Sequence, residues 1–149
     1  MNHAISPSIT STGPTAQLRT TLVAAVVVSA VLAAVCYYGV IGVTDDSPLL
    51  AVAIASAVSV VTAAILWWAN RAAFAAAEVS TRRTIVLAVL AVVSIGGVWF
   101  GITAPVAATA ALFGRKATAA GRTRLGSVTT SIAVLVLVAT VVLNLLGES

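Results

Sequence analysis

The chain contains a run of 30 uncharged residues, 84–113, that lies between two arginine-containing segments. As one straight helix this run would be about 45 Å long, whereas the hydrocarbon core of a bilayer is about 30 Å thick. Tilt alone would have to reach about 48° to fit it, and membrane helices usually tilt by about 0–40°. One ordinary membrane crossing therefore does not accommodate this run.

The middle of the run also disfavours a continuous helix. Gly96-Gly97, Gly101 and Pro105 lie close together there. Glycine weakens a helix, and proline removes a backbone donor and clashes with the preceding turn. We therefore predict two short helices, at about 84–100 and 104–119, joined by a tight turn.

The rest of the sequence divides into apolar blocks that contain no Asp, Glu, Lys, Arg or His. The chain of 149 residues is 60% hydrophobic and only 8% charged, too apolar for an ordinary soluble domain. The predicted fold is an all-α, polytopic transmembrane helical bundle with five membrane segments, the third and fourth forming the hairpin. A four-pass bundle is the alternative, in which 84–113 crosses once. The blocks are 20–43, 48–69, 84–113 and 127–147.

The loop charges favour the hairpin. Segment 70–83 carries three arginines and one glutamate, and segment 114–126 carries four cations and no acid. A single crossing of 84–113 would put these segments on opposite sides of the membrane, whereas a hairpin puts both on one side. The positive-inside rule then predicts a multi-pass protein of the bacterial inner membrane with its N-terminus in the cytoplasm and its C-terminus outside.

The start of the chain is polar. Residues 1–18 are mostly Ser, Thr, Pro, Gly and Asn with scattered apolar residues, so we predict a disordered cytoplasmic tail, followed by a single transmembrane domain at 19–149. A signal peptide is the alternative for the first apolar block. That block is longer than usual and Arg19 is the only clear cation before it, so a retained helix is favoured. Cys36, the only cysteine, is expected to be a buried, apolar-like residue.

The fourth segment is short for a crossing, because 103–114 spans only about 18 Å as a helix. Either it extends through 117–120, with Arg115 and Lys116 reaching the interface, or it is re-entrant. The sequence leaves both forms open.

Small residues recur at one-face helical spacing in every segment. In the hairpin they are Gly97, Gly101, Ala107 and Ala111. Small residues let helices approach closely in lipid, so this stripe either packs the bundle internally or docks a membrane-protein partner or a second copy.

The cations predict contacts with anionic lipid headgroups rather than with nucleic acid. The net charge is +4, but the cations sit in short loops beside apolar blocks, and no basic face with interleaved aromatic residues exists. The predicted headgroup contacts are Arg71, Arg82, Arg83, Arg115, Lys116, Arg122 and Arg124.

The sequence offers no motif for catalysis, metal or cofactor binding. Ion-coupled transporters place ionisable groups inside the membrane, and the apolar blocks contain none. His3, the only histidine, lies in the polar tail, so an enzyme is not expected. We predict a non-catalytic accessory or interaction subunit. The alternative is an oligomeric channel or facilitator for a small solute, lined by hydroxyl groups such as those of Ser59, Thr62, Thr130 and Thr140.

One part of the chain resembles a known family. The motifs are Ala104-Pro105, Phe113-Gly114-Arg115-Lys116, Gly121-Arg122 and Leu125-Gly126, before a final apolar helix. Over residues 84–147 the chain resembles small actinobacterial integral membrane domains of unknown function, which pair two hydrophobic helices around a loop with glycine and arginine. It departs from their pattern at Thr129-Thr130-Ser131, where glycines would be expected. The resemblance implies this helix pairing and no activity.

Overall fold

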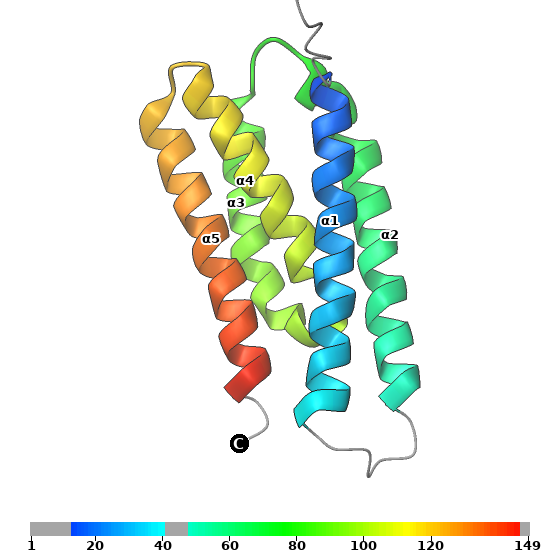
Figure 1. Cartoon of the computed structure of the whole chain (residues 1–149). Coiled ribbons are helices and arrows are strands. Elements are labelled where there is room, and N and C mark those ends of the chain that lie inside the picture. Colours follow the sequence, from blue (N-terminus) through cyan, green and yellow to red (C-terminus); the bar gives the residue numbers. More distant parts are fainter. Residues whose placement is uncertain (1–12, 41–47, 147–149) are drawn as a thin grey trace, which may run out of the picture.

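The chain folds as an all-α bundle (Figure 1). The structure, a computed structural model, describes residues 13–40 and 48–146. Five α-helices carry two short irregular extensions, the π-helical η1 and the 3-10-helical η2. The elements are α1 (Pro14–Ala34), η1 (Val35–Val40), α2 (Pro48–Ala75), α3 (Thr81–Val93), η2 (Ser94–Phe100), α4 (Thr103–Ala119) and α5 (Thr123–Leu146).

Four helical stretches in the described ranges are long and apolar enough to cross a membrane. They are Pro14–Tyr38, Pro48–Ala75, Thr81–Val98 and Thr123–Asn144. Their outward faces are rows of exposed valine, leucine and isoleucine, such as Val23, Leu135 and Ile65, each at least half exposed. Such faces suit lipid rather than water, so this is a transmembrane protein.

The predicted hairpin is confirmed, because the chain reverses direction between α3 and α4 (Figure 1). After η2, Gly101 takes a left-handed conformation with φ of 72° and starts the turn. Two hydroxyl groups hold this turn. Thr103 Oγ1 donates to the Ser94 carbonyl at 2.8 Å, and Ser29 Oγ of α1 donates to the Gly101 carbonyl at 3.3 Å.

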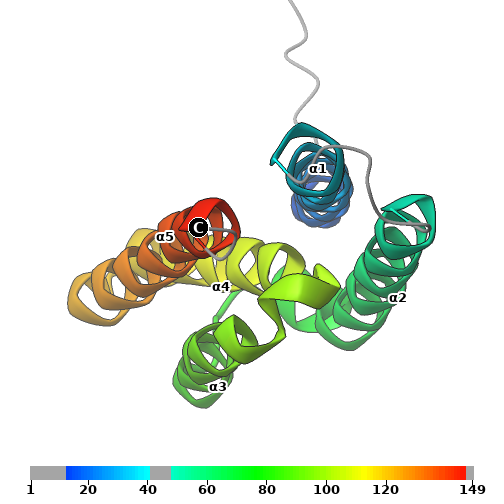
Figure 2. The same cartoon turned by 90° about the horizontal axis from the view of Figure 1, so that it is seen from below.

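Helix α4 lies in the middle of the bundle, with α1, α2, α3 and α5 around it (Figure 2). It contacts each of these helices, and Ala107, Ala110 and Phe113 are completely buried. Its 17 residues extend about 25 Å, from the turn to the opposite end of the bundle. The fourth segment is thus helical as far as Ala119, and the neighbouring helices bury most of its residues. It is not among the stretches long and apolar enough to cross a membrane, so the full crossing stays a prediction.

Helices α4 and α5 approach each other closely at two glycines. A Cβ atom built on Gly114 would lie 2.5 Å from Thr130 Oγ1 and 2.9 Å from the Gly126 carbonyl oxygen. One built on Gly126 would collide with the backbone of α4 at Gly114 and Thr118. The missing side chains therefore let the two backbones touch, as small residues do at helix interfaces in lipid.

The predicted start of the first helix is wrong by several residues. Helix α1 begins at Pro14, so residues 14–18 of the expected tail are helical. Pro14 suits the first turn because the missing N–H needs no partner there, and Leu18 is completely buried in the core. Residues 1–12 of that tail lie outside the described residues. Cys36 is buried, 3% exposed, as expected.

The turn at Gly101 can be tested by comparison with Gly121, because both glycines have a positive φ, 72° and 84° respectively. A Cβ on Gly101 would lie 2.7 Å from Ser29 Oγ and 2.8 Å from the Ala55 carbonyl oxygen, whereas one on Gly121 meets nothing within 4 Å. We expect Gly121→Ala to lower the free energy of unfolding by about 1–2 kcal/mol, the cost of backbone strain.

Gly101→Ala should lower the free energy of unfolding by about 1–3 kcal/mol more, since it adds overpacking against α1 and α2. Denaturant titration of the detergent-solubilised chain measures both values. Equal losses for the two variants would contradict the packing of the turn against Ser29 and Ala55.

Candidate functional site at the cationic end

The hairpin collects the positive charge at one end of the molecule. The start of α1, the end of α2, the start of α3, the end of α4 and the start of α5 lie together there (Figure 1). All eight lysine and arginine residues of the chain belong to these helix ends or the segments that join them. We call this end of the bundle the cationic end.

Lys116 of α4 ties the two cationic segments together. Its Nζ donates to the carbonyl oxygens of Phe74 and Ala76, the latter at 2.6 Å, where α2 ends. The last carbonyls of a helix have no partner within it and carry partial negative charge, so a cation there is stabilising. The ammonium also lies 4.9 Å from the centroid of the Phe74 ring, which packs edge-on against Phe113.

Two arginines make similar contacts. Arg122 donates to the Val79 carbonyl at 2.7 Å and to Thr81 Oγ1 at 2.5 Å, and so holds the α2–α3 connection against the α4–α5 turn. Arg83 donates to the Ala69 carbonyl at 2.9 Å and more weakly to Asn70 Oδ1 at 3.4 Å. Segments 70–83 and 114–126 are thus in direct contact, which a single crossing of 84–113 would not allow.

These contacts divide the seven predicted headgroup residues into two groups. Lys116, Arg122 and Arg83 bind backbone carbonyls within the protein. The other four have exposed side chains and make no side-chain hydrogen bond to another group within the described residues: Arg71, Arg82, Arg115 and Arg124. We call these four the exposed arginines. Arg83 and Arg122 are exposed as well, so what sets the four apart is that they bind no backbone carbonyl among the described residues.

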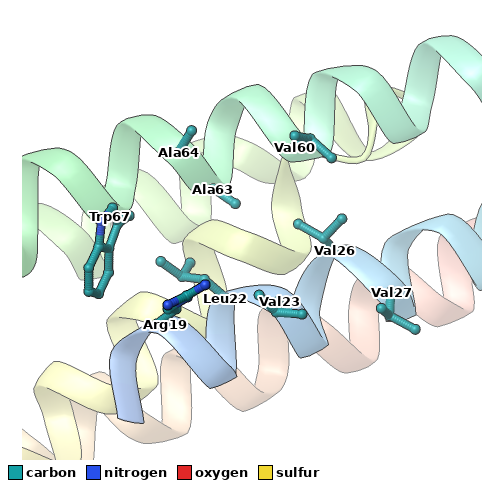
Figure 3. A pocket seen from close by; sticks show the side chains of 9 residues that line it. All are labelled: Arg19, Leu22, Val23, Val26, Val27, Val60, Ala63, Ala64 and Trp67. Atoms are coloured by element: carbon teal, nitrogen blue, oxygen red, sulfur yellow. The ribbon is translucent and has the colours of Figure 1, made fainter. Parts of the chain in front are cut away.

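A cleft between α1 and α2 opens near the same end (Figure 3). Its volume is about 370 Å³, and buried Leu22 and Ala63 contribute to its lining. Arg19 of α1 and Trp67 of α2 lie at one end of it, and Val27 and Val60 lie at the other (Figure 3). The lining is completed by Val23, Val26 and Ala64.

Sequence reasoning did not find this cleft. Arg19 and Trp67 are 48 positions apart in the sequence, so only the packing of α1 on α2 brings them together. Trp67 was identifiable as an interfacial residue, since Trp67-Trp68 precedes Asn70-Arg71, but that signal contains nothing about a neighbouring helix.

A small cavity of about 20 Å³, lined in part by polar side chains, lies near the opposite end of the bundle. Ser29, Tyr37, Thr140 and Asn144 contribute to its lining, and it has room for about one water molecule. Asn144 Nδ2 donates to the Thr140 carbonyl at 2.7 Å, so the amide has a partner. Ser59 Oγ is the buried polar side-chain atom without a hydrogen-bond partner among residues 13–40 and 48–146.

The stripe of small residues in the hairpin faces mainly inward. Ala107 is completely buried, and Gly101 lies against Ser29 and Ala55. Ala111 is half-buried beside the core cluster. Gly97 is partly exposed and approaches Ile102 of the same turn. Gly101 and Ala107 therefore serve internal packing, and the docking alternative for this stripe stays a prediction.

No His, Cys, Asp or Glu cluster that could hold a metal ion occurs within the described ranges. No protein-family model, curated protein or solved structure matches the chain. The resemblance of residues 84–147 to actinobacterial membrane domains therefore stays a prediction.

The hydrogen bonds from Lys116 to the end of α2 can be tested by substitution, with the adjacent Arg115 as the control. Lys116→Gln should lower the free energy of unfolding by about 1.5–3 kcal/mol, the range for hydrogen bonds to a charged group. Arg115→Gln, one residue earlier, should change it by no more than about 0.5 kcal/mol, because Arg115 is exposed. Unfolding titrations of the two variants measure the difference. Equal stability of both would show that Lys116 does not hold the end of α2.

Proposed function

We propose that this protein is a non-catalytic accessory or interaction subunit of a bacterial inner membrane, with its cationic end in the cytoplasm. The observation that carries the proposal is the exposed arginines, which stand at the end of the bundle where Lys116, Arg122 and Arg83 bind backbone carbonyls. Outward cations at the membrane surface attract anionic lipid headgroups and acidic segments of a partner protein.

The orientation follows from the positive-inside rule. Short loops rich in Lys and Arg remain in the cytoplasm, and here all eight such residues belong to one end. The N-terminal end of α1 is also at this end, which supports a cytoplasmic N-terminus (Figure 1).

The hydrogen bonds of the buried polar side chains support a structural rather than a catalytic role for these side chains. Thr84, Thr109, Thr140 and Asn144 each donate to the carbonyl four residues earlier. A nucleophile would need a base within hydrogen-bond reach, whereas these donors already have backbone partners.

The hydroxyl groups considered for a channel lie in different environments. Ser59 is completely buried and Thr140 is 5% exposed. Thr62 and Thr130 donate to the Val58 and Gly126 carbonyls of their own helices. This arrangement gives the channel alternative less support than the accessory role. A solute flux assay in liposomes separates them, since an accessory subunit leaves permeability unchanged.

The orientation can be tested with single cysteines in a Cys36→Ala background. We expect a membrane-impermeant maleimide applied to intact spheroplasts to label Val43→Cys, in the α1–α2 connection. Ala77→Cys and Thr123→Cys, at the cationic end, should react only after the membrane is permeabilised. The reverse pattern would overturn the orientation.

The interaction role predicts a contact that depends on the exposed arginines. A photocrosslinking amino acid at Ala77 or Thr123 should give a discrete adduct with a second protein in cells. Replacing Arg71, Arg82, Arg115 and Arg124 together with Gln should reduce that adduct about tenfold or more, if the four charges contribute at least about 1.4 kcal/mol together.

The matched control replaces the same four arginines with Lys, which retains the charge. It should retain most of the adduct, and both variants should unfold like the unmodified chain. An adduct that persists unchanged in the Gln variant, or a strictly monomeric protein without any adduct, would contradict the proposal.

A further inference from the structure

We propose that the cleft between α1 and α2 holds one acyl chain of an anionic phospholipid, whose phosphate binds Arg19. The inference adds a lipid site to the proposed function and rests on it only for the placement of the bundle in a membrane. It concerns a single bound lipid, distinct from the general attraction between the exposed arginines and the membrane surface.

The lining of the cleft is apolar along its length and charged at one end. Leu22, Val23, Val26, Val60 and Ala63 contribute only hydrocarbon to it. The guanidinium of Arg19 lies at the end nearest the start of α1 (Figure 3). None of the lining residues is acidic, so the charge of Arg19 has no carboxylate partner within the cleft. A ligand that matches this pattern is an amphiphile with an anionic head and a hydrocarbon tail.

The dimensions fit a lipid chain. Arg19 and Val27 are eight residues apart, which is about 12 Å along a helix. The volume of about 370 Å³ is near the lower end of small-ligand sites, about 300–1,000 Å³. A transmembrane helix is about 10 Å across with its side chains, too wide to enter a cleft of that volume.

The depth of Arg19 in the membrane matches the depth of the lipid phosphates. Trp67 lies opposite Arg19 in the cleft, and Trp68 beside it is 72% exposed. Tryptophans collect at the depth of the lipid headgroups, so a guanidinium at this depth meets lipid phosphates. Arg71 follows Trp67 by one helical turn, which places a second cation just beyond the same end of the cleft.

The bound chain would fill a gap left by small side chains. Ala63 of α2 points toward α1 in the cleft, and Ala64 contributes to its exposed lining (Figure 3). Val23, Val27 and Val60 are 57%, 55% and 53% exposed along it. An acyl chain would cover these side chains and also cover Trp67, while Trp68 would remain in contact with bulk lipid.

The adjacent Trp67 and Trp68 can serve as fluorescent reporters of lipid inside and outside the cleft. In one variant of the full chain Trp67 is the only tryptophan, through Trp68→Phe and Trp99→Phe. In the matched variant Trp68 is the only one, through Trp67→Phe and Trp99→Phe. Each is reconstituted in phosphatidylcholine vesicles that contain a minor fraction of phospholipid brominated on its acyl chains, with either a phosphatidylglycerol or a phosphatidylcholine headgroup. Bromine quenches tryptophan fluorescence on contact.

We expect brominated phosphatidylglycerol to quench Trp67 more than an equal fraction of brominated phosphatidylcholine, and to quench Trp68 without this preference. Arg19→Gln should reduce the apparent affinity for phosphatidylglycerol at Trp67 about tenfold, as expected for loss of a charge-assisted hydrogen bond. Arg19→Lys, which retains a positive charge at this position, should retain most of the preference. Ala64→Phe, which adds a ring to the lining of the cleft, should reduce the excess quenching.

Equal quenching of Trp67 by the two headgroups would overturn the proposal, as would an unchanged preference in Arg19→Gln. A chain that forms dimers, with Trp67 shielded from both lipids until Ala64→Phe separates them, would assign the cleft to a second copy instead and overturn it too. The vesicles contain no other protein, so failure of this experiment leaves the proposed interaction role untouched.

Discussion

The reversal of the chain at Gly101 is the constraint on which the rest of the structure depends. A left-handed residue with no room for a Cβ, between Ser29 of α1 and Ala55 of α2, turns 30 uncharged residues into two antiparallel helices. The turn sends α4 back through the middle of the bundle and brings both arginine-rich segments to the same end. The cationic end therefore results from a backbone conformation as much as from charge.

The bilayer, acting as an apolar solvent, explains why α4 lies inside the bundle and the other helices lie around it. Helix α4 is rich in alanine and threonine and central, whereas the four stretches long and apolar enough to cross a membrane lie around it. Lipid offers no hydrophobic driving force between helices, so close packing of small side chains decides which surfaces meet. The contact of Gly114 with Gly126 and the complete burial of Ala107 and Ala110 are examples of this packing.

Much of the architecture could be predicted from the sequence because the determining signals are local. Gly96-Gly97, Gly101 and Pro105 interrupt a run too long for one crossing, and the charge of the flanking loops indicates the same reversal. The start of α1 at Pro14 was missed, because a polar composition hides the burial of Leu18 that only tertiary packing creates. The different roles of the individual cations could not be predicted from the sequence either. Lys116 and Arg115 are adjacent, yet one binds the end of α2 and the other is exposed.

The same limit applies to the cleft. Its residues come from two helices whose separation in space depends on how each packs against α4, and no sequence spacing encodes that distance. Once the packing is known, Arg19 and Trp67 can be interpreted together as the charged and aromatic end of an otherwise apolar groove. The cationic end then presents two kinds of charge, one that holds the helices together and one that faces lipid or a partner.

The fold-back is tested most directly by the distance between the two cationic segments in a membrane. Spin labels at Ala77→Cys and Thr123→Cys, in a Cys36→Ala chain reconstituted in vesicles, allow that distance to be measured by pulsed electron resonance. Because Arg122 joins these segments through Val79 and Thr81, the account predicts one short distance, well below the bilayer thickness of about 40–45 Å. A distribution centred at or beyond that thickness would place the segments on opposite sides and contradict the account.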